Sequence, residues 1–146
     1  LRNKDARAIL AIVIECDEHS HSFYLPSCES AKIDDEFISV QQYLSNEGAA
    51  HGARTGRADS HLIPIVFVKV NPNDYDGPRT NLDDRINATA ALVNSYAHMS
   101  EAEIEALHTH APIVHVLYYH SKEGGHHLAH FAANAPEWEW EYHVLG

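Results

Sequence analysis

The stretch AILAIVI (residues 8–14) is an unbroken apolar run, and ECDEHSH (residues 15–21) follows it directly. A short continuous run rich in β-branched residues predicts a strand that is buried on both faces. The second part places three carboxylates and two imidazoles in seven positions. The sequence therefore predicts a strand of a covered sheet that ends in a cluster of ionisable side chains.

Two carboxylates in this cluster have the spacing of a metal site. Glu15 and Asp17 lie two positions apart, so their side chains point to the same side of an extended strand. Carboxylate oxygens are the ligands that Mg²⁺ and Mn²⁺ prefer, and His21 is placed to complete the shell or to act as a general base. The alternative is a solvated acidic junction between strand and loop, because carboxylates are usually exposed.

Predicted helices and strands alternate along the chain. Apolar residues recur every three or four positions over residues 28–44 and 82–96, which predicts two amphipathic helices. A second apolar strand is predicted over residues 62–70, and Ser100 with Glu103 forms a capping-box pattern that predicts a short third helix. Residues 46–60 contain three spaced glycines and few apolar residues, so they predict an exposed insertion.

Two motifs resemble those of a known nuclease superfamily. Residues 15–21 fit the pattern Glu-x-Asp-x-x-x-His, and the second predicted strand runs into Asn71-Pro72 with Tyr75 three positions later. In this order, the motifs resemble PD-(D/E)XK (restriction-endonuclease-like) nucleases, in the branch similar to very-short-patch-repair endonucleases and related viral and protist domains. The resemblance extends from about Ala8 to Tyr96. It implies a metal-dependent endonuclease that uses Mg²⁺ or Mn²⁺ to hydrolyse nucleic-acid phosphodiester bonds.

The resemblance also implies residues of the site, which are Asp5, Glu15, Asp17 and His21, and the sequence adds Lys32 and Lys69 as further candidates. Glu15 and Asp17 are carried over as catalytic metal ligands, and His21 as the histidine of the family motif. Asp5 is the candidate for an acidic ligand that the family places upstream, usually on the neighbouring strand of a hairpin. Lys32 and Lys69 are the candidates for binding substrate phosphate, with a solvated helix lysine as the alternative for Lys32.

The fold implied is α/β: a restriction-endonuclease-like mixed sheet flanked by helices, with a β-rich C-terminal extension. We expect residues 1–99 to form the nuclease-like core and residues 100–146 to extend the same domain by a short helix and a hairpin of strands 113–119 and 126–131. In the family a helix and one or two strands precede the first motif, whereas seven residues precede the apolar run here. Leu1 in place of Met leaves two interpretations open, a processed product or a fragment of a longer chain.

Composition limits the classes of function. The 146 residues include 21 acidic and 10 basic side chains, a net charge of −11, which repels phosphate at long range and argues against a nucleic-acid coat protein. Thirteen histidines would take this charge to about +2 if all were protonated, so the charge changes steeply near neutral pH. Apolar runs too short for a bilayer and two cysteines predict an intracellular protein without a membrane partner.

Two other functions compete with the nuclease hypothesis. The first is a catalytically inactive nuclease-fold subunit of a large assembly, favoured by the acidic charge and by aromatic residues such as Trp138 and Trp140, which suit packing on a protein partner. The second is a binding module that responds to pH or metal through its histidines. The nuclease hypothesis depends on the side chains of Glu15 and Asp17 converging where a cation fits.

Overall fold

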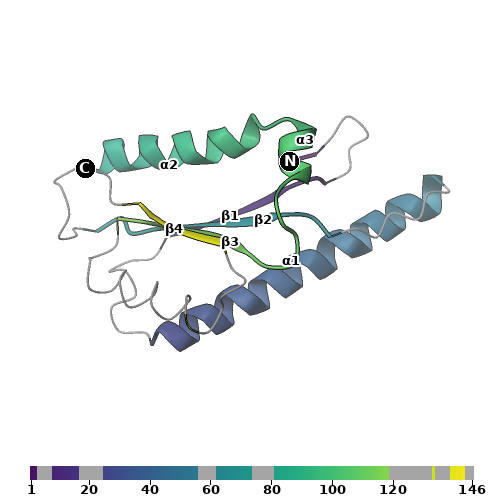
Figure 1. Cartoon of the computed structure of the whole chain (residues 1–146), viewed down its shortest axis with the longest axis horizontal. Helices are drawn as coiled ribbons and strands as arrows, with labels where there is room; N and C mark the ends of the chain where they lie inside the picture. Colours follow the sequence, from purple (N-terminus) through teal and green to yellow (C-terminus); the bar gives the residue numbers. More distant parts are fainter. Residues whose placement is uncertain are drawn as a thin grey trace.

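A computed structural model of the chain describes residues 1–2, 8–16, 25–55, 62–73, 81–118, 133 and 139–143. In these residues four strands form one parallel sheet in the order of the sequence: β1 (Ala11–Cys16), β2 (Ile65–Val70), β3 (Ile113–Leu117) and β4 (Glu139–His143). The helices are α1 (Pro26–Thr55), α2 (Leu82–Ala97) and α3 (Glu101–Glu105). Figure 1 shows α1 on one face of the sheet and α2 on the other. The predicted α/β class is confirmed.

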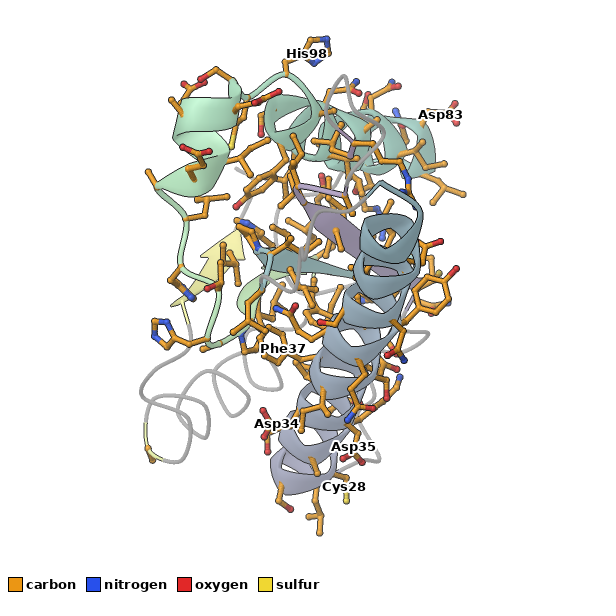
Figure 2. The ribbon with its side chains drawn as sticks, turned by 90° about the vertical axis from the view of Figure 1, so that its right-hand side faces the viewer. Cys28, Asp34, Asp35, Phe37, Asp83 and His98 are labelled. Carbon is orange, nitrogen blue, oxygen red and sulfur yellow. The ribbon has the colours of Figure 1, made fainter. Side chains whose placement is uncertain are left out.

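Strand alternation divides the interior into two cores. On one face, Phe67 of β2 and Val114 of β3 pack against Ile33 of α1. On the other, Val68 of β2 packs with Tyr96 of α2. Figure 2 shows Phe37 directed from α1 to the sheet, whereas Asp83 and His98 lie on the outer side of α2. Each helix therefore buries one stripe and leaves its other face to solvent.

The two helical crossovers have opposite handedness. The chain steps from β1 to β2 through α1 and from β2 to β3 through α2, always to the next parallel strand in the same direction. Because α1 and α2 lie on opposite faces, one of these connections is left-handed, although nearly all such crossovers are right-handed. The arrangement therefore differs from a doubly wound sheet, in which the strand order reverses before the helices change face.

The described sheet is parallel, whereas a mixed sheet was expected from the sequence. Every pairing between the described strands is parallel, and β3 and β4 are part of the same sheet as β1. An antiparallel contact occurs outside the strands: Arg2 forms a bridge with Ala8, and the Leu1 amino group donates to the Leu10 carbonyl. The predicted strand over residues 126–131 lies outside the described residues.

Two elements differ from their predictions. The α1 helix continues to Thr55, so the predicted insertion is wrong over residues 46–55. The apolar stripe stops near Leu44, but ion pairing and hydrogen bonding continue, since Glu47 accepts from Arg2 and Tyr43. The β1 strand is an edge strand with Ile14 59% exposed, so it is not buried on both faces. No helix in the described part of the chain has the length and apolar character needed to cross a membrane.

Candidate functional site

Four charged side chains meet between the sheet and the first turns of α1. They are Glu15 from β1, Lys69 from β2, and Glu29 and Lys32 from α1, and we refer to them as the charged cluster. Glu15 and Lys69 are register partners near the carboxyl ends of neighbouring strands. Ligand sites of open α/β sheets lie at this edge.

Lys69 is the centre of the charged cluster. Its ammonium nitrogen lies 2.5 Å from Oε2 of Glu15 and 2.7 Å from Oε2 of Glu29. Its side chain is 1% exposed and that of Glu29 is 3% exposed. Because both carboxylate oxygens are close to one nitrogen, the two acids are held near each other. The second oxygen of Glu15 forms an ion pair with Lys32, whose side chain is 40% exposed.

In the charged cluster, the positive charges of two lysines are balanced by the negative charges of two glutamates. A buried lysine is rare unless it is paired, and here two carboxylates offset its desolvation. Glu29 lies in the first turn of α1, where the helix dipole also favours a negative side chain. Desolvation and the neighbouring Lys69 charge lower the pKa of the Lys32 ammonium, and Glu36 opposes this shift.

The structure brings together three of the six predicted site residues. Glu15, Lys32 and Lys69 meet in the charged cluster. The other three, Asp5, Asp17 and His21, lie outside the described residues, so the convergence of the first-strand carboxylates stays a prediction.

Glu29 is a member of the site that was not predicted from the sequence. Glu29 stands four positions before Ile33 and eight before Phe37, and therefore lies on the apolar stripe of α1. A carboxylate on the buried stripe of a helix is a detectable signal, because it requires a cation on the facing element. Lys69, within the apolar run of β2, is that cation.

The Asn71-Pro72 motif connects the end of β2 to the end of β3 through hydrogen bonds. Asn71 is fully buried, donates to the carbonyl of Tyr118, and accepts from the backbone N–H of Asn73. Arg85 of α2 donates to the carbonyls of Asn71 and Asn73 and lies over the Tyr118 ring. These bonds fix the ends of β2 and β3 to the start of α2, which is the structural role expected of an Asn-Pro turn.

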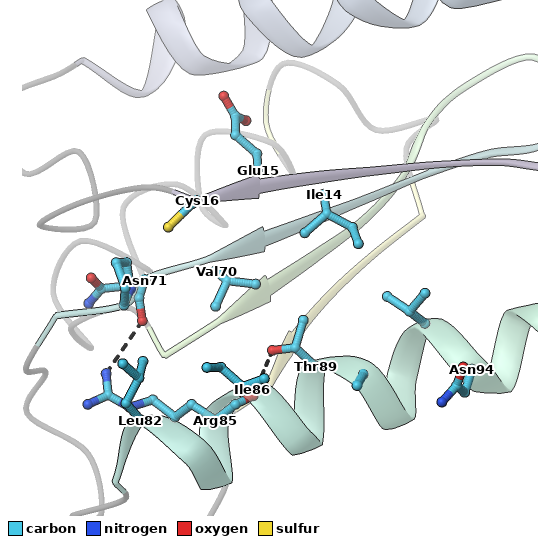
Figure 3. Close-up of a pocket in the computed structure, with 13 residues that line it drawn as sticks. Ile14, Glu15, Cys16, Val70, Asn71, Leu82, Arg85, Ile86, Thr89 and Asn94 are labelled. Atoms are coloured by element: carbon cyan, nitrogen blue, oxygen red, sulfur yellow. Dashed lines mark hydrogen bonds between the residues drawn. The ribbon is translucent and has the colours of Figure 1, made fainter.

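An apolar cavity of about 480 Å³ lies on the other face of the sheet. The ends of β1 and β2 and most of the length of α2, from Leu82 to Asn94, line it, with Ile14, Val70 and Ile86 among the apolar side chains. In Figure 3 the Glu15 carboxylate points to the α1 side, away from this cavity. Glu15 therefore belongs both to the cavity lining and to the charged cluster, but its carboxylate is directed to the cluster.

The metal site expected from the sequence is not seen among the described residues. They contain no group of three or more His, Cys, Asp or Glu side chains arranged to hold a metal ion. Glu15 and Glu29 offer hard carboxylate oxygens, and two ammonium groups are bound where a cation is favoured. Asp17 and His21 are the further donors that the sequence places next to Glu15.

Comparison of the chain with protein-family models, with curated proteins and with solved structures found no match.

Proposed function

We propose that the chain is a metal-dependent endonuclease-like domain that hydrolyses nucleic-acid phosphodiester bonds, with Glu15 and Asp17 at its centre. The observation that carries this proposal is the Lys69 ammonium, buried beneath α1 and bonded to Glu15 at the carboxyl edge of the sheet. Replacing a buried ion pair by apolar residues is often neutral or stabilising, so the pair suggests a role beyond stability. A titratable side chain whose pKa is shifted by burial and by a charged neighbour, as for Lys32, marks a candidate functional site.

The fold offers further support. Helices cover both faces of the sheet, as in a restriction-endonuclease-like core. The Arg2–Ala8 bridge is antiparallel, the pairing sense of the hairpin that the resemblance implies before β1. Asp5, the candidate upstream ligand, lies in sequence between the two bridged residues, but these adjoin the amino end of β1, whereas Glu15 is near its carboxyl end.

The residues of this chain would act in three ways. Glu15, with Asp17, would hold Mg²⁺ or Mn²⁺, which activates water and stabilises charge on the phosphoryl group. Lys69 fixes the position of Glu15 through a short charge-assisted hydrogen bond, and Glu29 fixes Lys69. Lys32, the more exposed lysine, is the candidate for contacting a substrate phosphate.

The second candidate function is an inactive nuclease-fold subunit of a larger assembly. One observation favours it: both oxygens of Glu15 are paired with lysine ammonium groups. If these pairs persist in every state, they neutralise Glu15 permanently and leave it no capacity for a metal ion. The net charge of −11 also suits a protein partner better than a nucleic acid.

Cleavage assays on the purified chain test the proposal. We expect Mg²⁺- or Mn²⁺-dependent cleavage of DNA or RNA, and we expect Glu15→Ala and Asp17→Ala each to lower its rate by about 100-fold or more. Loss of groups that only support a metal ligand already costs 10–100-fold. Glu105→Ala, which removes an exposed carboxylate at the end of α3, is the matched control and should cleave normally.

Two outcomes would count against the endonuclease. Unchanged cleavage in both variants would exclude the proposed site. Absence of cleavage by the unaltered chain, on DNA and RNA with either metal, would favour the subunit function. A structure obtained with Mn²⁺ would show whether density lies between Glu15 and Asp17.

A further inference from the structure

The apolar cavity between the sheet and α2 has the size of a small-molecule site. Its volume is about 480 Å³, within the range of roughly 300–1,000 Å³ that is usual for ligand pockets. An engineered apolar cavity of about 150 Å³ binds benzene, so this cavity has room for about three such rings. It lies at the carboxyl ends of β1 and β2, and open α/β sheets bind their ligands at this edge.

Apolar side chains form most of the cavity wall. Those contributed by the two strands and by α2 include Ile14, Val70, Ile86, Ala90 and Val93. Ile14 is 59% exposed and Ile86 is 55% exposed, so large apolar side chains of the lining meet solvent at the opening. Covering such surface releases water that gains little from contact with it, so an apolar occupant is stabilised by the hydrophobic effect.

The polar side chains of the lining are engaged elsewhere in the protein. Arg85 donates to the carbonyls of Asn71 and Asn73, and the Thr89 hydroxyl donates to the Arg85 carbonyl (Figure 3). The Glu15 carboxylate is directed to the charged cluster. Both charged side chains of the described lining are therefore committed to other partners. An uncharged occupant suits these walls, because a charged one would lose its hydration without gaining a partner.

We propose that this cavity is a binding site for a small, neutral, hydrophobic molecule of about two to three rings. The volume sets the size of the ligand, the apolar walls set its hydrophobic character, and the engagement of Arg85 and Glu15 makes it neutral. The net charge of −11 further disfavours an anion. This role goes beyond the proposed function and does not depend on it, because neither a metal nor a nucleic acid takes part.

A matched pair of fluorescent probes tests the ligand class. N-phenyl-1-naphthylamine is neutral and has three aromatic rings, and 1-anilinonaphthalene-8-sulfonate is the same molecule with an added sulfonate. At low ionic strength we expect the neutral probe to bind saturably at one site per chain, about tenfold or more tightly than the sulfonate. Equal or tighter binding of the sulfonate would overturn the neutral class. Lack of saturable binding of the neutral probe would overturn the site.

Substitutions in the lining test where the neutral probe binds. Ala90→Trp fills the cavity and Ile86→Asn makes its wall polar, so each should weaken binding by about tenfold or more. Ile38→Asn is the matched control, because Ile38 is a 51% exposed isoleucine on α1, at the opposite face of the sheet. It should bind like the unaltered chain. Equal weakening in Ile38→Asn and Ile86→Asn would overturn the location, and Ala90→Trp carries the test if Ile86→Asn does not fold.

The two free cysteines provide a second readout with an internal control. Both are exposed, but Cys16 lines the cavity whereas Cys28 lies on α1. Saturating N-phenyl-1-naphthylamine should slow the alkylation of Cys16 by N-ethylmaleimide about fivefold or more, because a bound ligand blocks access to the thiol. Alkylation of Cys28 should not change, as measured by mass spectrometry of the labelled peptides. Equal slowing at both cysteines, or at neither, would overturn the site.

A second copy of the chain is the competing occupant. Sedimentation analysis over a range of chain concentrations distinguishes the two. If the chain self-associates and probe binding falls as association rises, the cavity is an interface between copies and the ligand site is overturned. If the neutral probe binds the monomer, Cys16 alone is protected and Ile86→Asn binds more weakly, the ligand site stands whether or not the chain cleaves nucleic acid.

Discussion

Lys69 shows how one residue can organise a site. It interrupts the apolar sequence of β2 on the face that meets α1, where Phe67 and Ile65 precede it at alternate positions. Its ammonium bridges Glu15 on the neighbouring strand and Glu29 on the helix. The side chain of Glu15 is 18% exposed, so one end of the cluster reaches solvent while the other is buried. A buried charge arranged in this way stabilises only while both partners are present.

Removal of Lys69 should therefore be strongly destabilising. Lys69→Met is expected to lower the free energy of unfolding by about 3–5 kcal/mol, because it leaves the buried Glu29 carboxylate without its ammonium. Lys69→Met/Glu29→Gln should recover part of this loss, and urea unfolding of the double-mutant cycle measures the coupling. A loss below about 1 kcal/mol in the single variant would show that the Lys69–Glu29 pair contributes no more than a solvent-exposed ion pair.

At the level of elements, capping and periodicity place the helices. Asn81 caps α2, accepting from the N–H of Asp84, and Ser100 with Glu103 completes the capping box of α3. The capping box could be recognised in the sequence, and the prediction of α3 is confirmed. The end of α1 could not be predicted from the sequence, because its last turns lack an apolar stripe and are supported by contacts such as the Arg2–Glu47 ion pair.

The α3 capping box should make stability depend on pH in acid. The Ser100 hydroxyl and N–H donate to the Glu103 carboxylate and hold its pKa below the ordinary value of 4.5. This stabilisation is present above pH 4.5 and is lost as the pH falls through the lowered pKa. Glu103→Gln keeps the capping geometry without the charge. We expect it to be less stable than the unaltered chain near pH 6 and equal to it near pH 3, in urea unfolding. A difference that does not change with pH would contradict this.

At the level of the whole molecule, the net charge disfavours nucleic-acid binding, whereas the fold brings two lysines together at one place. The net charge of −11 opposes approach to nucleic acid, while the carboxyl edge of the sheet holds two lysines. The strands are parallel and one crossover is left-handed, so the fold depends on contacts between segments that are far apart in the sequence. The same distant contacts assemble the charged cluster.

Histidine titration should tune association with nucleic acid. Histidine is the side chain whose ordinary pKa lies near this range, and the chain has thirteen, so a fall from pH 8 to pH 6 makes the net charge less negative and weakens the repulsion of phosphate. We expect the chain to bind a DNA oligonucleotide more tightly at pH 6 than at pH 8, at constant low ionic strength, in fluorescence anisotropy. The difference should decrease with added salt. Equal affinities at the two pH values would exclude this global effect.

The amino-acid sequence by itself determined the α/β class, the apolar strands, most helix positions and the capping box of α3. These features follow from local periodicity and from groups a few residues apart. The tertiary structure decided what Glu15 faces: its partner Lys69 lies 54 positions away, and Lys32 reaches it from α1. Glu29 of α1 pairs with Lys69. Register between separate strands and the face that a helix covers are set by packing of the whole chain. For that reason the motif indicated a carboxylate site, and only the fold supplied the lysines that hold it.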